Sequence, residues 1–141
     1  MRVLVADDHS IVRQGVRRLL ELAGMTVVAE AVDGLQAIHL CIDHRPDVLV
    51  LDLAMPELNG FEVIARLRTI DDSPAIVVLS AHADSSYVLR AVEKGVRAYV
   101  LKTSTDEDLI PAIHAAAGGG SFFSSALRLA AGTRFGAACR S

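Results

Sequence analysis

Short apolar runs alternate with helix-like segments along this chain. Five runs rich in β-branched residues begin 21 to 28 residues apart, at Arg2–Ala6, Thr26–Val32, Asp47–Leu51, Ala75–Ser80 and Arg97–Leu101. The segments between them repeat apolar residues every three or four positions, the spacing that places side chains on one face of an α-helix. The alternation predicts an α/β fold of five βα units, with a parallel sheet and right-handed crossovers.

Apolar positions predict the inward faces of the helices. Three faces are formed by Val12, Val16, Leu19, Leu20 and Ala23; by Leu35, Ile38 and Ile42; and by Phe61, Ile64 and Leu67. Two further helices are expected over Ser86–Lys94, with Val88, Leu89 and Val92 inward, and over Thr105–Ala117. Gly24 and Gly95 are expected to end helices in the left-handed conformation. Ser104–Glu107 fits a capping box for the last helix, which Pro111 is expected to kink or restart.

Two of the strands are apolar at every position instead of alternating. These are Val48–Leu51 and Ile76–Leu79, and the pattern is typical of central parallel strands that helices cover on both faces. We therefore expect a doubly wound (βα)5 sheet over residues 1–117. Three glycines at 118–120 signal the end of the domain. Residues 118–141 are then expected to form a Gly/Ala/Ser/Arg-rich linker or tail, with room for one short helix at Ser125–Ala131.

Composition narrows the class of protein. A chain of 141 residues with 52% apolar and 22% charged residues predicts one folded domain without intrinsic disorder. Two cysteines, Cys41 and Cys139, are too few for a disulfide framework. Asp7 and Asp8 interrupt the first apolar run, and no apolar stretch approaches the length of about 18 residues that a membrane span needs. We expect a soluble, cytoplasmic protein without membrane contact.

Charge is distributed unevenly. The net charge is −3 overall, but residues 1–117 carry −6 and residues 118–141 carry +3, from Arg128, Arg134 and Arg140. An acidic body argues against nucleic-acid binding by the main domain, because phosphate contacts need a basic surface. The three arginines of the tail are expected to be solvated.

Polar residues follow the expected strands where each one ends. They are Asp7 and Asp8, Asp33, Asp52, Ser80 and Lys102. In an open parallel sheet, ligands bind beyond the carboxyl ends of the strands. Taken singly, these residues have plain interpretations: a helix N-cap for Asp7–Asp8, a solvated strand end for Asp52, a turn cap for Ser80 and an exposed lysine for Lys102. Their common position at one edge favours a binding site.

Three of these residues suit a metal. If the first and third strands are neighbours, Asp7, Asp8 and Asp52 converge and repel one another unless a cation compensates them. An oxygen-only site that keeps some waters suits Mg²⁺, or Mn²⁺. A backbone carbonyl of the Leu53–Pro56 loop is a further candidate ligand. A metal, a carboxylate nucleophile, a hydroxyl (Ser80) and an ammonium (Lys102) together favour phosphoryl transfer onto aspartate.

The same stretches resemble the receiver domain of two-component response regulators. The similarity covers about residues 1–117 and is carried by Leu4–His9, Leu51–Gly60, Leu79–Ala81 and Tyr99–Lys102; Asp8–Gly15 and Tyr87–Ala91 resemble the NarL/FixJ type. The resemblance implies a flavodoxin-like strand order, 2-1-3-4-5. It also implies that Asp52 accepts a phosphoryl group from a sensor histidine kinase, and that Asp7, Asp8, Asp52 and the Ala54 carbonyl serve Mg²⁺. Ser80 and Lys102 then hold the phosphoryl oxygens, and Ser80 and Tyr99 act as the switch.

Two features fall outside the family pattern or carry no assigned role. Thr103 follows Lys102 where the family usually has proline, which leaves the geometry after Lys102 open. Five dispersed histidines are interpreted as surface or packing residues, since the kinase supplies the donor histidine: His9, His39, His44, His82 and His114. His82, two residues after Ser80, is the one placed to line the mouth of the site.

The favoured function is a phosphoacceptor switch instead of an enzyme, with self-catalysed phosphorylation and dephosphorylation compatible with it. Phosphorylation is expected to change the surface formed by Ser86–Ala117, to promote a homodimer and to control transcription. DNA contact is expected only through an output domain, because no helix-turn-helix pattern fits Ser121–Ser141. The alternatives are a stand-alone or phosphorylation-independent binding module of receiver-like fold, and a flavodoxin-type cofactor protein. The latter needs a glycine- and hydroxyl-rich loop after the first strand, where two acids stand instead.

Overall fold

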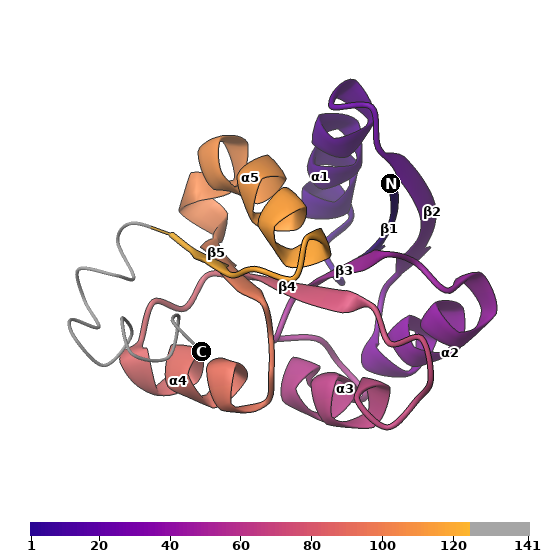
Figure 1. Cartoon of the computed structure of the whole chain (residues 1–141), viewed down its shortest axis with the longest axis vertical. Coiled ribbons are helices and arrows are strands. Elements are labelled where there is room, and N and C mark those ends of the chain that lie inside the picture. The colour runs from indigo at the N-terminus through magenta and orange to yellow at the C-terminus, as the bar shows by residue number, and fades with distance from the viewer. Residues whose placement is uncertain (125–141) are drawn as a thin grey trace.

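A single parallel sheet forms the centre of the molecule, which a computed structural model describes for residues 1–124 (Figure 1). Its strands lie in the order β2-β1-β3-β4-β5-β6. The strands are β1 (Arg2–Ala6), β2 (Thr26–Ala31), β3 (Val48–Leu51), β4 (Ala75–Ser80), β5 (Ala98–Leu101) and β6 (Phe122–Phe123). The helices are α1 (Ser10–Leu22), α2 (Gly34–His44), α3 (Gly60–Leu67), α4 (Ser85–Glu93) and α5 (Thr105–Ala117). The predicted doubly wound α/β fold and its order 2-1-3-4-5 are confirmed.

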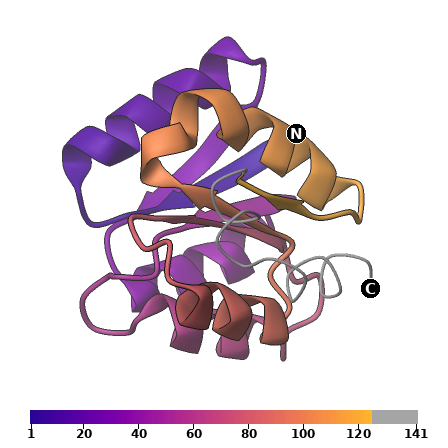
Figure 2. The ribbon, with the colours of Figure 1, turned by 90° about the vertical axis from the view of Figure 1, so that its left-hand side faces the viewer.

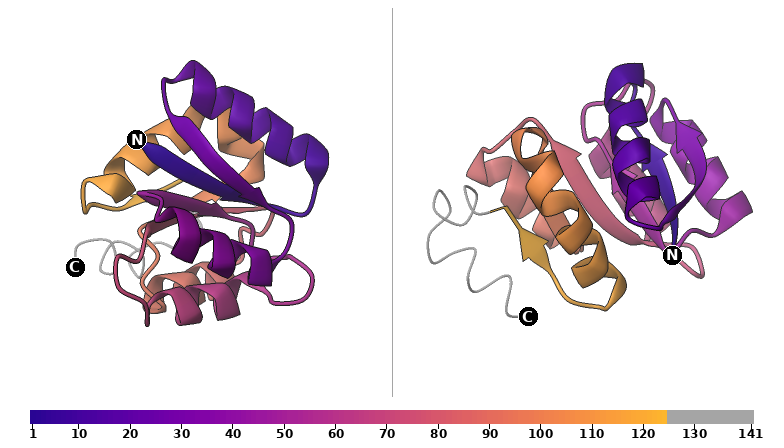
Figure 3. Two further views of the ribbon diagram at one scale, coloured as in Figure 1. Left: turned by 90° about the vertical axis from the view of Figure 1, so that its right-hand side faces the viewer. Right: turned by 90° about the horizontal axis from the view of Figure 1, so that it is seen from above.

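Helices cover both faces of the sheet (Figures 1 and 2). Helices α1 and α5 lie over one face, where they are neighbours, and α2, α3 and α4 cover the other (Figure 3). Alternate strand residues therefore enter two separate cores: Val3 and Val5 of β1 pack towards α1 and α5, and Leu4 and Ala6 pack towards the other helices. Every residue of β3 and β5 is buried, as expected for strands that are covered on both sides.

The inward face of α2 differs from the prediction. Leu35 and Ile42 are 42% and 49% exposed, and the buried residues of α2 are Gly34, Ala37 and Cys41. A Cβ at Gly34 would collide with the backbone of Leu58. Because this end of the helix lies so close to Leu58, small residues occupy its most buried positions, and Leu35 and Ile42 point outward. Ile38 packs against the core from a partly buried position, as predicted.

Strand β6 lies within residues 118–141, where only a linker or tail was predicted. Its two residues pair in parallel with β5, Phe122 with Ala98 and Phe123 with Tyr99. Phe123 is buried in the same core as Tyr99, and the Ser124 hydroxyl accepts a hydrogen bond from the Leu101 amide at 3.2 Å. The helix predicted at Ser125–Ala131 lies outside the described residues.

The helix ends match the predictions in part. Gly24 and Gly95 have φ angles of +83° and +93°, as expected for left-handed helix ends. The capping box predicted at Ser104–Glu107 is wrong, because the Ser104 side chain makes no cap hydrogen bond. A 3₁₀ turn (Lys102–Ser104) leads into α5 instead, and the Thr105 hydroxyl donates to the Lys102 carbonyl at 2.7 Å. Pro111 lies inside α5, which continues through it without restarting.

Candidate functional site

The carboxyl ends of four strands bring the predicted site residues to one rim of the sheet. Because β1 pairs with β3 in the register Ala6–Leu51, the next residues, Asp7 and Asp52, lie side by side. The Asp52 amide donates to the Ala6 carbonyl at 3.0 Å and holds this alignment. Ser80 ends β4 and Lys102 directly follows β5. Asp33 does not join this group, since its side chain caps α2 by accepting a hydrogen bond from the Gln36 amide.

Asp52 lies at the centre of the rim and is 3% exposed. One carboxylate oxygen, Oδ1, accepts a hydrogen bond from the Ala54 amide at 3.1 Å. The other, Oδ2, accepts one from the Lys102 ammonium at 3.2 Å. A buried carboxylate held in one orientation by an amide and an ammonium is suited to present an oxygen lone pair to an electrophile.

Asp7 is as deeply buried as Asp52, at 2% exposed. Its Oδ1 accepts a hydrogen bond from the His9 amide at 2.8 Å. Its Oδ2 lies 3.2 Å from Lys102 Nζ as an ion pair, yet this buried oxygen makes no hydrogen bond. Since buried carboxylate oxygens are normally hydrogen-bonded, Asp7 Oδ2 has lone pairs left for a further ligand.

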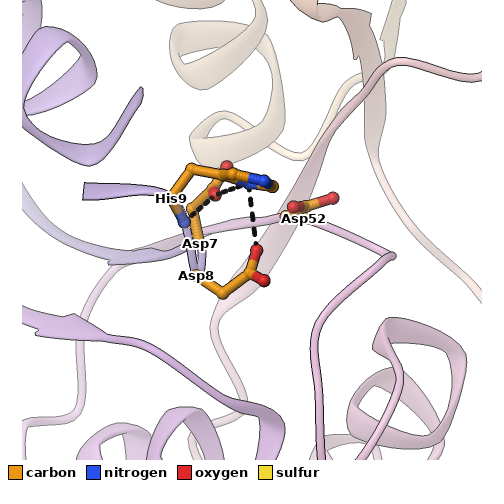
Figure 4. A group of neighbouring side chains, drawn as sticks. All are labelled: Asp7, Asp8, His9 and Asp52. Carbon is orange, nitrogen blue, oxygen red and sulfur yellow. Dashed lines mark hydrogen bonds and ion pairs between the residues drawn. The ribbon is translucent and has the colours of Figure 1, made fainter. Parts of the chain in front are cut away.

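Asp8 and His9 form the open side of the acidic cluster (Figure 4). The Asp8 side chain is 30% exposed, and its Oδ1 lies 3.1 Å from His9 Nδ1. His9 Nδ1 also lies 3.2 Å from Asp7 Oδ1. One potential ligand atom from each of Asp7, Asp8, His9 and Asp52 lies within 4.8 Å of the others, so this cluster has the size of a metal site.

His9 is the member of this cluster that the sequence analysis did not include: its side chain is 63% exposed, in agreement with the surface prediction, but its contacts with Asp7 and Asp8 were not predicted. Its position directly after Asp7–Asp8, before the first turn of α1, is the signal that places it there. The preference of Mg²⁺ for oxygen ligands favours the three carboxylates over the imidazole as the metal-binding groups. The Ala54 carbonyl stays a predicted ligand; the structure places the Ala54 amide against Asp52.

Lys102 is the cation that compensates the buried carboxylates. Burial alone lowers the pKa of its ammonium group, but the negative charges of Asp52 and Asp7 outweigh that effect and the net pKa is raised. Lys102 therefore stays protonated at neutral pH. One positive charge among three carboxylates leaves a net negative pocket, which favours binding of a divalent cation.

Ser80 and Tyr99 are linked through the backbone of His82. The His82 amide donates to Ser80 Oγ at 3.0 Å, and the Tyr99 hydroxyl donates to the His82 carbonyl at 2.8 Å. Ser80 is 1% exposed and Tyr99 is fully buried, and this burial raises the pKa of the Tyr99 hydroxyl. The ring of Tyr99, which the resemblance assigns to the switch together with Ser80, lies inside the core.

Comparisons with known proteins agree with this geometry. Residues 3–114 match the family model for the response regulator receiver domain. The chain is 41% identical over 126 residues to the nitrate/nitrite response regulator protein NarL of Escherichia coli K12, an alignment that covers 89% of this chain and 58% of that protein. It is 37% identical over 115 residues to the oxygen regulatory protein NreC of Staphylococcus epidermidis, with 80% and 53% covered. The chain thus spans little more than half the length of these relatives.

Solved structures that are similar to this chain are also receiver domains of response regulators. The signal receiver domain of NarL from Mycobacterium tuberculosis is 39% identical with a TM-score of 0.80, and the alignment covers 84% of this chain and 96% of that one. The receiver domain of RcsB from Salmonella enterica serovar Typhimurium, solved with the phosphomimetic BeF₃⁻, is 28% identical with a TM-score of 0.85, covering 92% and 96%. Within residues 1–124, no helix combines the length and the apolar character needed to cross a membrane.

Proposed function

The chain belongs to the response regulator receiver domain family, and from this premise we propose that Asp52 accepts a phosphoryl group from a sensor histidine kinase. The observation that carries this proposal is the buried Asp52 carboxylate, held by Lys102 at 3.2 Å beside a second buried carboxylate, Asp7. A flavodoxin-type cofactor protein is disfavoured, because acids occupy the loop after β1 where a phosphate group would have to bind.

The transfer is a substitution at phosphorus. An Asp52 carboxylate oxygen attacks the phosphorus of a phosphohistidine, the new O–P bond forms as the N–P bond breaks, and the departing imidazole nitrogen keeps the electron pair of that bond and takes up a proton. The reaction needs the attacking and leaving atoms roughly in line and needs compensation of the charge on the phosphoryl oxygens. The Lys102 ammonium lies 3.2 Å from Asp52 and supplies one such charge. The buried Ser80 hydroxyl supplies a hydrogen-bond donor once it turns from the His82 amide.

The acidic cluster fits a resident Mg²⁺. Asp7, Asp8 and Asp52, together with the Ala54 carbonyl, would hold it, and the buried Asp7 Oδ2, which lacks a hydrogen bond, is the atom that most needs such a partner. When bound, Mg²⁺ (or Mn²⁺) neutralises negative charge on the phosphoryl oxygens and on the carboxylates. Asp8, the most exposed of the three, must leave His9 to contribute fully, since His9 Nδ1 lies 3.1 Å from its carboxylate.

The phosphoryl group acts as a switch through Ser80 and Tyr99. A phosphorylated Asp52 carries close to two negative charges, about one more than the free carboxylate, and its phosphoryl oxygens draw the Ser80 hydroxyl away from the His82 amide. Tyr99 is bound to the carbonyl of the same residue, so its position changes with that of His82. The surface formed by α4, β5 and α5 then changes, and with it homodimer formation and a transcriptional output. Relatives support this direction, since RcsB has been solved as dimers bound to DNA.

The acceptor assignment is tested by chemical phosphorylation. Incubation with phosphoramidate and Mg²⁺ is expected to add the mass of one phosphoryl group to the parent protein and none to Asp52→Asn, which lacks the nucleophilic oxygen. Asp33→Asn is the matched control, because asparagine also caps a helix and Asp33 lies outside the cluster. Intact-mass spectrometry gives the readout. Labelling that persists in Asp52→Asn, or that is unchanged by EDTA, contradicts the assignment.

The switch is tested by NMR with beryllofluoride and Mg²⁺. The parent is expected to show amide shifts both in the pocket and across Ser85–Ala117, whereas Ser80→Ala is expected to keep only those in the pocket, because the coupling hydroxyl is gone. Shifts confined to the pocket of the parent would mean that the site is not coupled to this surface. Equal distant shifts in Ser80→Ala would keep the switch and remove the route through Ser80.

A further inference from the structure

A stack of rings joins the loop between β4 and α4 to two helices. The His82 imidazole lies flat on the Tyr87 ring, with centroids 4.6 Å apart and planes 11° apart. On α4 and α3, the Tyr87 and Phe61 rings are 5.7 Å apart at 41°. The Arg90 guanidinium lies over the Phe61 ring, 4.2 Å from its centroid. Tyr87 is the central member, because it contacts both the loop residue and the ring on α3.

The backbone of the stacked loop residue makes both hydrogen bonds to the switch pair. The His82 amide donates to Ser80 Oγ, and the His82 carbonyl accepts from the Tyr99 hydroxyl, at 3.0 and 2.8 Å. The flanking side chains, Ala81 and Ala83, are exposed and contribute no packing that would hold the peptide in place. The His82 ring is therefore the side chain by which this short segment is attached to the body of the protein.

We propose that Tyr87 is a positioning residue for Ser80 and Tyr99, acting through the ring of His82. The stack fixes the imidazole against α4, and this in turn fixes the peptide that donates to Ser80 and accepts from Tyr99. Tyr87 touches neither the phosphoryl site nor a metal ligand, so its effect is indirect. The part of this inference that concerns phosphoryl transfer rests on the proposed function; the part that concerns Tyr99 stands on the contacts alone.

The geometry explains why an aromatic side chain is needed at this position. An aliphatic residue fills space but does not select an orientation for a ring that lies on it, whereas two aromatic planes prefer a defined offset arrangement. The segment around His82 is held through the His82 ring. When the ring is no longer fixed in one orientation by Tyr87, the His82 peptide is no longer fixed either. Both hydrogen bonds of the His82 peptide then become longer or are replaced by bonds to water, and the Tyr99 hydroxyl gains solvent.

Two substitutions separate positioning from simple packing. Tyr87→Leu keeps an apolar side chain but removes the ring, and Tyr87→Phe keeps the ring as the matched control. The chain has two tyrosines, Tyr87 and Tyr99. In both variants Tyr99 is the sole tyrosine, so absorbance and fluorescence report on it alone, and both variants equally lack the Tyr87 hydroxyl.

The first measurement is spectrophotometric titration of Tyr99 without metal or phosphoryl donor, with circular dichroism to confirm the fold at each pH. Tyr87→Phe is expected to retain the raised pKa that burial gives Tyr99. In Tyr87→Leu the ionisation constant of Tyr99 is expected to rise towards that of a solvated tyrosine, whose pKa is about 10. If Tyr87→Leu unfolds too early at high pH, acrylamide quenching of Tyr99 fluorescence at neutral pH reports the same exposure. Equal values in the two variants overturn the proposal.

The second measurement tests the route through His82. His82→Ala is made in the Tyr87→Phe background, so that Tyr99 stays the sole tyrosine. It keeps the peptide but removes the stacked imidazole, so it is expected to reproduce the effect of Tyr87→Leu on Tyr99 quenching. The double variant for comparison is Tyr87→Leu with His82→Ala. The double variant is expected to show no further change, because both substitutions break the same contact. Effects that add in full would mean that Tyr87 acts on Tyr99 by another path, and would overturn the proposal.

The third measurement is the rate of phosphoryl incorporation from phosphoramidate with Mg²⁺. Tyr87→Leu is expected to be about 3- to 10-fold slower than Tyr87→Phe, a change of the size that loss of orientation at a reacting group produces. Equal rates overturn the assigned link to Ser80. If the parent protein takes no phosphoryl group, the proposed function fails, whereas the titration and quenching results still decide whether Tyr87 positions Tyr99.

Discussion

The two ends of the parallel sheet hold their charges in opposite ways. At the amino end, arginines donate to the carbonyls where helices terminate: Arg2 to Arg45 after α2, Arg68 to Lys94 after α4, and Arg97 to Gly119 after α5, at 3.1, 2.6 and 3.1 Å. At the carboxyl end, two buried carboxylates, Asp7 and Asp52, share one lysine, Lys102, and one buried oxygen, Asp7 Oδ2, has no hydrogen bond.

The difference follows from the direction of the chain. In βα units each helix runs antiparallel to the strands, so helix carbonyl ends gather at the amino end of the sheet, where cations suit the helix dipole. The arginines there are exposed. Each one donates to a backbone carbonyl at the end of a helix, so it satisfies an acceptor that the helix itself leaves unpaired. At the other end the strands present Asp7 and Asp52 to each other without complete compensation. Charge left unsatisfied in an otherwise well-packed protein is typical of a functional site.

The largest expected effect is on the rate of phosphoryl incorporation, and it comes from comparing the two cations that flank β5, Lys102 and Arg97. Lys102→Met is expected to slow phosphoryl incorporation by about a hundredfold, because a preorganised positive group at the reacting oxygens is lost. Arg97→Met removes the cation at the opposite end of the same strand and is expected to leave the rate within about twofold, since its partner is the Gly119 carbonyl. The rates of mass increase with phosphoramidate provide the measurement. Similar losses in both variants would mean that the contrast between the two ends carries no function.

A smaller effect is expected on stability with and without metal. Without Mg²⁺, Asp7→Asn is expected to be more stable than the parent by roughly 1 kcal/mol, because one of the repelling charges is gone. At a Mg²⁺ concentration about a hundredfold above Kd, the parent is expected to gain about 2.7 kcal/mol and Asp7→Asn much less. Urea unfolding at both metal concentrations measures this. Arg68→Met is the control from the amino end and is expected to respond to Mg²⁺ as the parent does.

The smallest expected effect is on the alkaline dependence of stability. The folded-state pKa of Lys102 is raised, so the stabilisation from its charge is complete below the unfolded pKa of about 10.4 and is lost as pH rises through the folded value. The free energy of unfolding of the parent is therefore expected to fall more steeply in that range than that of Lys102→Met. Burial also raises the pKa of Cys41 to about 12 and that of Tyr99, but these contributions are common to both proteins and cancel. Parallel curves would refute the assigned role of the carboxylate charges.

Local patterns predicted the regular parts of the fold well. All five predicted strands are present with ends that differ by no more than one residue, and β1 and β4 have the predicted bounds. Continuous apolar runs predicted that β3 and β4 lie in the centre of the sheet, and they do. These patterns succeed because a strand that is buried on both faces needs apolar residues at every position, and this can be read directly in the sequence.

Predictions were weaker where the burial, pairing or contacts of a residue depend on neighbours that are distant in the sequence. Leu35 and Ile42 have helical spacing, but the close approach of α2 to Leu58 reserves the inward positions for Ala37 and Cys41. Strand β6 has two residues, too few for a pattern, and it forms because β5 offers a free edge and Phe123 fills the core beside Tyr99. His9 is exposed as predicted, but its contacts with both acids were not predicted, because the orientation of its ring depends on where the sheet places the Asp7 and Asp8 carboxylates.

By itself, the sequence determined which residues end the strands, and therefore that acids, a hydroxyl and an ammonium meet at one rim, because parallel strands all point their carboxyl ends the same way. Only the tertiary structure decided how those groups are satisfied: that Lys102 pairs with both Asp7 and Asp52, that one Asp7 oxygen lacks a hydrogen bond, and that the His82 peptide joins Ser80 to Tyr99. Residue type specifies what a side chain can do. Contacts of about 3 Å between groups far apart in the sequence, such as Tyr99 with the His82 carbonyl and Lys102 with Asp7, depend on the packing of the whole sheet and its helices.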